Sequence, residues 1–116
     1  MNPIPRPLRA GAMLSLALLL PVAQAWADAR TIDVRVTGGH ADGGVKVVRL
    51  VRDDEVVLRV TADKDDELHL HGYNLRAQVK PDVPAVLRFV ATKTGRFGAE
   101  LHGAGADVVV FEIYPR

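Results

Sequence analysis

The residues best suited to chemistry form two short polar pairs. His69 and His71 are separated by a single residue, and Glu100 and His102 repeat this spacing later in the chain. Side chains alternate between the two faces of a β-strand, so each pair projects from one face if its segment is extended. Neutral imidazole and carboxylate groups are ligands that suit Cu(II) or Zn(II). If the two strands are neighbours, three imidazoles and one carboxylate converge on a metal site.

A second interpretation makes these histidines ordinary solvated surface groups. Apolar residues alternate with the polar pairs and are expected to face the core, which places the histidines on the solvent side of the sheet. These apolar residues are Leu68, Leu70, Phe97, Ala99 and Leu101. A metal site would then lie at a strand end, where Gly72 or Gly103 permits a bulge that re-aims the side chains. We expect the remaining histidine, His40, to be solvated within a glycine-rich loop over 38–44.

The elements that must position these pairs are strands. From residue 30 onward, apolar residues recur with a period of two, and clusters of Gly, Asp, Asn and Pro separate the alternating segments. The expected strands are 32–37, 45–51, 56–61, 67–71, 77–80, 86–90, 96–102 and 108–114. Seven or eight short strands without a long amphipathic segment predict an all-β fold, either a sandwich or a Greek-key barrel.

Composition excludes several classes of function. The chain has 116 residues, enough for one small domain, and its formal net charge of +1 offers no strong cationic field for nucleic acid. The absence of Cys excludes disulfides, thiolate metal sites and cysteine nucleophiles. The only serine, Ser15, lies in the amino-terminal segment discussed next. Since no further acid–base constellation accompanies the polar pairs, we do not expect an enzyme.

The first 27 residues have the three-part pattern of a secretory signal peptide. Arg6 and Arg9 precede an apolar run over 10–20, and Pro21 and small residues follow. Cleavage is expected after Ala25 or Ala27, and the uncharged stretch over 10–27, at ~18 residues, is about long enough to consider a membrane anchor. We favour cleavage, which leaves a single domain over 28–116 in the periplasm or outside the cell, with no membrane span.

Parts of the mature chain resemble cupredoxin-like domains. The segment 66–73 reads DELHLHGY and the segment 95–102 reads GRFGAELH, and together they resemble an exported bacterial group with an H-x-H-G-Y segment. The resemblance continues through residues 79–81 and 86–91 and the final FEIYP, so it covers essentially the whole mature chain. It implies a Greek-key β-sandwich related to plastocyanin and to the copper domain of cytochrome oxidase subunit II.

The resemblance also implies which residues bind copper. The family's first copper ligand corresponds to His71, and its cysteine ligand corresponds to a position near Leu101, next to His102. The family's later His and Met ligands have no counterpart in this chain. Because a blue-copper site requires a thiolate, a role in blue-copper electron transfer is excluded.

Two functions therefore remain open. In the first, the protein binds Cu(II), or Zn(II), with His71 and His102 as primary ligands, His69 as a third ligand or close neighbour, and Glu100 as a further carboxylate. It would store, handle or deliver metal together with a periplasmic or membrane metal-handling protein. Binding would weaken as the pH falls through about 6.5, because the imidazoles must be neutral. In the second, the domain binds no metal and acts as an interaction or accessory module.

The intact mass of the exported protein tests the predicted processing. We expect a chain that begins at Trp26 or Asp28, because signal peptidase cleaves after small residues in this pattern. A mass that still includes Met13 would instead indicate a membrane-tethered form.

Overall fold

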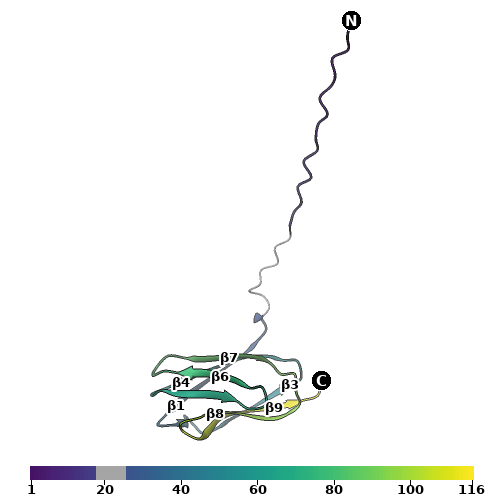
Figure 1. Cartoon of the computed structure of the whole chain (residues 1–116). Helices are drawn as coiled ribbons and strands as arrows, with labels where there is room; N and C mark the ends of the chain where they lie inside the picture. Colours follow the sequence, from purple (N-terminus) through teal and green to yellow (C-terminus); the bar gives the residue numbers. More distant parts are fainter. Residues whose placement is uncertain (18–25) are drawn as a thin grey trace.

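The computed structural model describes residues 1–17 and 26–116, and all of its strands lie between residues 30 and 114. The strands are β1 (Arg30–Thr37), β2 (His40–Ala41), β3 (Lys46–Val51), β4 (Glu55–Ala62), β5 (Asp66–Leu70), β6 (Leu75–Val79), β7 (Ala85–Val90), β8 (Gly95–Leu101) and β9 (Ala106–Tyr114) (Figure 1). Within these described ranges, no helix is long and apolar enough to cross a membrane.

The strands form two sheets, with the orders β2-β1-β4-β7 and β3-β9-β8-β5-β6. The pairs β1–β4 and β3–β9 are parallel, and the other pairs are antiparallel. Chain neighbours such as β3 and β4 lie in different sheets, so the connections cross between the layers. This arrangement confirms the predicted all-β Greek-key sandwich.

An apolar core between the sheets holds the layers together. On β4, Val56, Leu58 and Val60 are fully buried, as the period-two pattern requires. The rings of Phe89 on β7 and Phe111 on β9 meet edge-on across the core, with centroids 5.2 Å apart. No polar or charged residue is buried in the described part of the chain, so burial of apolar area is the main stabilising contribution.

The strand limits differ in places from the sequence-based expectation. Nine strands are present in the described ranges because the loop expected over 38–44 contains β2. Gly38 and Gly39 adopt φ angles of 59° and 83°, which close a tight turn and pair Thr37 with His40. Strand β5 ends at Leu70, so His71 lies in the turn that leads to β6.

The amino-terminal prediction falls partly outside the described residues. Residues 18–25, which include Pro21 and the first expected cleavage site after Ala25, are not described by the structure. Residues 1–17 contain no strand or helix. The signal peptide and the domain boundary at residue 28 therefore stay predictions.

Truncating a buried side chain on β4 tests the position of the core. We expect Leu58→Ala to lower the free energy of unfolding by about 2–5 kcal/mol, because the substitution leaves a cavity between the sheets. Val86→Ala on the adjacent strand β7 is a matched control, since Val86 is 42% exposed. The control should cost less than about 1 kcal/mol in the same urea titration. Equal losses in the two variants would contradict this assignment of the core.

Candidate metal centre

The polar pairs lie on two adjacent strands of the five-stranded sheet. Strands β5 and β8 are antiparallel neighbours, and their register places His69 directly opposite Glu100. The alternate residues Leu68, Leu70, Ala99 and Leu101 are buried, as the alternation predicts, and Phe97 packs half-buried against the core. The polar side chains therefore project from the outer face of this sheet.

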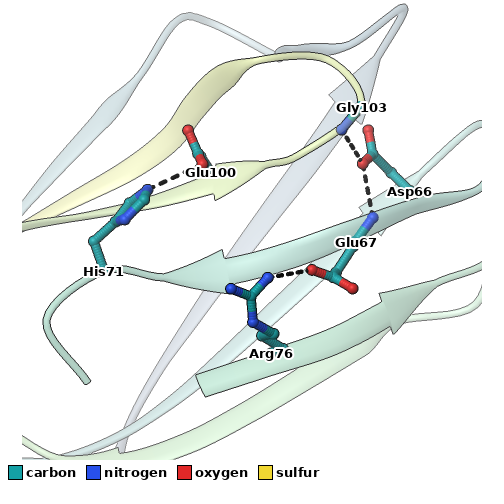
Figure 2. Close-up of polar contacts among 6 residues, drawn as sticks. All are labelled: Asp66, Glu67, His71, Arg76, Glu100 and Gly103. Carbon is teal, nitrogen blue, oxygen red and sulfur yellow. Dashed lines mark hydrogen bonds and ion pairs between the residues drawn. The ribbon is translucent and has the colours of Figure 1, made fainter. Parts of the chain in front are cut away.

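Three of these side chains come together on that face. His69, His71 and Glu100 each offer a donor atom, and the three atoms lie within 4.8 Å of one another. The imidazole rings of His69 and His71 are 4.5 Å apart between centroids. Nε2 of His71 lies 3.1 Å from a carboxylate oxygen of Glu100, and Figure 2 shows this contact. The cluster is open to solvent, since the side chains of His71 and Glu100 are 47% and 28% exposed.

The donor set fits Cu(II) or Zn(II) better than it fits a soft ion. Two imidazoles and one carboxylate supply nitrogen and oxygen, and the carboxylate charge partly offsets a divalent cation. Ligands at about 2.1 Å from one tetrahedral ion are ~3.4 Å apart, close to the observed separation between His71 and Glu100. The sequence has no Cys, so no thiolate can join these donors.

The surroundings of His69 favour its neutral form. Partial burial of the ring lowers the pKa of His69 below 6.5, and the nearby positive charge of Arg76 lowers it further. Arg76 lies opposite His69 on β6, and its guanidinium donates to the carboxylate of Glu67. A neutral imidazole is the form that binds metal, so the lowered pKa keeps His69 available as a ligand.

His102 does not join the cluster, although the sequence analysis assigned it a primary role. Because the strands are antiparallel, the two polar pairs run in opposite directions. The backbone N–H of His71 donates to the carbonyl oxygen of Gly98, whereas the backbone N–H of His102 donates to the carbonyl oxygen of Glu67. Gly98 and His102 are four residues apart along the chain, or ~13 Å in an extended strand. The two proposed primary ligands therefore lie at opposite ends of the β5–β8 pair.

Asp66 anchors the loop that begins at His102. One carboxylate oxygen of Asp66 accepts the N–H groups of Glu67 and Gly103 at 2.7 and 2.6 Å, and the other accepts that of Ala104 at 3.1 Å (Figure 2). These contacts hold the loop against the start of β5, away from His71. The backbone N–H of Gly103 therefore binds Asp66. No bulge at Gly103 turns His102 toward His71.

His40 and Arg76 differ in their relation to the cluster. His40 is exposed on the short strand β2 and does not join the cluster, as expected. Arg76 was not singled out, although the turn residues Gly72 and Asn74 indicated a hairpin whose register sets Arg76 opposite His69. The side chain of Arg76 is thus a neighbour of the cluster that only the strand pairing reveals.

The architecture is shared with solved structures of copper proteins. A multicopper oxidase from Pediococcus acidilactici matches with a TM-score of 0.61 and 14% identity, over 76% of this chain and 27% of that chain. A copper-binding protein solved by NMR in its apo form matches with a TM-score of 0.60 and 14% identity, over 75% of this chain and 89% of that chain. No protein-family model and no curated protein sequence matches the chain.

The domain has the cupredoxin-like fold. A heme-copper terminal oxidase also matches, with a TM-score of 0.56 and 17% identity, over 79% of this chain and 67% of that chain. The cupredoxin-like domain spans only about a quarter of the multicopper oxidase, so the likeness concerns one domain of that enzyme. The resemblance noted in the sequence is confirmed at the level of the fold, together with the absence of the blue-copper Cys.

Proposed function

We propose that this cupredoxin-like domain is an exported protein, periplasmic or secreted, that binds Cu(II) at His69, His71 and Glu100, with Zn(II) as the alternative ion. Its role in this proposal is to handle metal together with a periplasmic or membrane metal-handling protein, rather than to catalyse a reaction. The observation that carries the proposal is the convergence of the three donor groups on one exposed sheet face.

The openness of the cluster favours metal exchange over electron transfer. Three donors from the chain leave at least one coordination position for water or for a group from a partner, because Zn(II) and Cu(II) take four or more ligands. A metal bound at the surface of a sheet can pass to another protein without opening the core. The missing thiolate removes the ligand on which blue-copper electron transfer depends.

A specific contact favours the alternative function, a metal-free interaction or accessory module. The 3.1 Å contact between His71 and Glu100 satisfies both side chains without an ion. In that case the His71–Glu100 contact is an exposed polar pair, which contributes little to stability. The two functions differ in whether the cluster binds Cu(II) more tightly than scattered surface histidines do.

Titration of the metal-free mature domain with Cu(II) separates these functions. We expect one bound ion per chain, and the variants His71→Ala and Glu100→Gln should each lower the affinity about tenfold or more, since each removes a ligand. Calorimetry gives the affinity, and electron paramagnetic resonance should show nitrogen ligation. The visible absorption spectrum should lack an intense thiolate charge-transfer band.

The matched controls for this titration are His102→Ala and His40→Ala. Both remove an exposed imidazole outside the cluster, so the affinity should change less than about twofold. If His102→Ala weakens binding as much as His71→Ala does, the proposed ligand set is wrong. If all four variants bind like the original chain, the metal-free function is favoured.

The pH dependence of binding gives a further expected outcome. Protons compete with Cu(II) for each imidazole, so the affinity should fall toward low pH, by up to about tenfold per pH unit for each ring that must lose a proton. Because the pKa of His69 is lowered, mainly by partial burial, its share of the loss begins at a lower pH than that of an ordinary histidine. Calorimetry in weakly coordinating buffers across this range measures the effect. An affinity that does not depend on pH would contradict imidazole ligation.

A further inference from the structure

The three cluster residues are held in place by different means. His69 and Glu100 lie within β5 and β8, each of which pairs with a strand on both sides, although the β8–β9 register shifts between Ala99 and Glu100. His71 lies beyond the end of β5, in the turn before β6. Its N–H donates to the carbonyl oxygen of Gly98 at 3.0 Å, and the rest of its position depends on the residues that follow.

The next residue, Gly72, lies flat against an aromatic ring. A Cβ atom at this position would clash with Cδ1 of Phe97, and the φ angle of 81° also disfavours any other residue. The close approach of the Gly72 backbone to Phe97 lets the chain turn immediately after His71. The turn therefore packs directly on the Phe97 ring.

Tyr73 then ties this turn to the opposite sheet. Its ring packs against Phe89 and Phe97 with centroids 5.2 Å away in each case. Its hydroxyl accepts the backbone N–H of Lys93 at 3.1 Å and donates to the carbonyl oxygen of the same residue at 3.3 Å. Lys93 precedes β8 in the connection from β7, so the contact joins the β5–β6 turn to the β7–β8 turn.

The side chain of Lys93 also contacts this turn. Its ammonium group donates to the carbonyl oxygen of Gly72 and lies 5.3 Å from the centre of the Tyr73 ring. Residues 72 and 73 are thus fixed through backbone and side chain by one residue of the neighbouring turn. We call this set of contacts the Tyr73–Lys93 clamp.

We propose that Tyr73 is a positioning residue for His71. The hydroxyl of Tyr73 holds the turn so that the imidazole of His71 can share an ion with His69 and Glu100. The inference rests on the proposed function and adds to it a residue that touches no donor atom of the cluster. Metal ligands must be held within about 0.5 Å of their working geometry. A shift of this turn would move His71 more than His69 and Glu100, because His71 lies beyond the end of β5 and is joined to β8 there through its backbone bond to Gly98.

Tyr73→Phe is the direct test because it removes the hydroxyl and keeps the ring in its packing against Phe89 and Phe97. We expect the affinity for Cu(II) to fall about three- to tenfold, the loss associated with one or two exposed hydrogen bonds. Tyr114→Phe is the matched control, since Tyr114 is 47% exposed at the end of β9, far along the chain from the clamp. The control should leave the affinity unchanged.

A second background separates positioning from general loosening of the domain. In a chain that already carries His71→Ala, Tyr73→Phe should change the remaining Cu(II) affinity less than about twofold. An equal loss in both backgrounds would overturn the inference. If His71→Ala weakens binding but Tyr73→Phe does not, the positioning role is wrong and the proposed function stands.

Amide hydrogen exchange of the metal-free protein gives a readout independent of metal. Tyr73→Phe should speed exchange at the His71 and Lys93 amides severalfold, while the His69 amide within β5 keeps its original rate. Lys93→Met, which removes the ammonium contact to Gly72 and leaves the backbone partners of Tyr73, should produce a smaller change in the same direction. Unchanged exchange at His71 in both variants would overturn the inference, whatever the outcome of the copper titration.

Discussion

The antiparallel register between β5 and β8 is the constraint on which the candidate site depends. It places His69 opposite Glu100 and brings His71 alongside Gly98. A slip of one residue would turn both histidines into the core and bring Leu68 and Leu70 out to solvent. The cost of exposing two fully buried leucines is therefore what keeps the donor groups on the outer face.

The same register explains why a carboxylate, rather than a third histidine, completes the cluster. In an antiparallel pair, two identical spacings run in opposite directions, so the second residue of one pair, His71, lies far from the second residue of the other, His102. His102 is left beside Glu67, and Asp66 binds the loop that follows it. A parallel pairing of these segments could have brought His71 and His102 together, but β5 and β8 are antiparallel neighbours.

The structure also divides the cluster into two residues within strands and one residue in the turn beyond β5. His69 and Glu100 belong to the strand ladder, and the pKa of His69 is lowered mainly by partial burial and by Arg76. His71 depends on the Tyr73–Lys93 clamp, which connects the two sheets at one end of the sandwich. The geometry and the electrostatics of the cluster thus depend on β5, β6, β8 and the turn before β8. The fold itself is shared with larger copper proteins.

The sequence by itself determined the all-β class, most strand positions, the inward set of apolar residues and the absence of any thiolate ligand. These properties follow from the period-two pattern and from composition, which depend only on residue order. The grouping of His69, His71 and Glu100, the separation of His102 and the role of Arg76 were decided by the tertiary structure. Strand direction and register set the distances between these side chains. Both depend on the packing of the whole core, and residue spacing within one segment does not determine them.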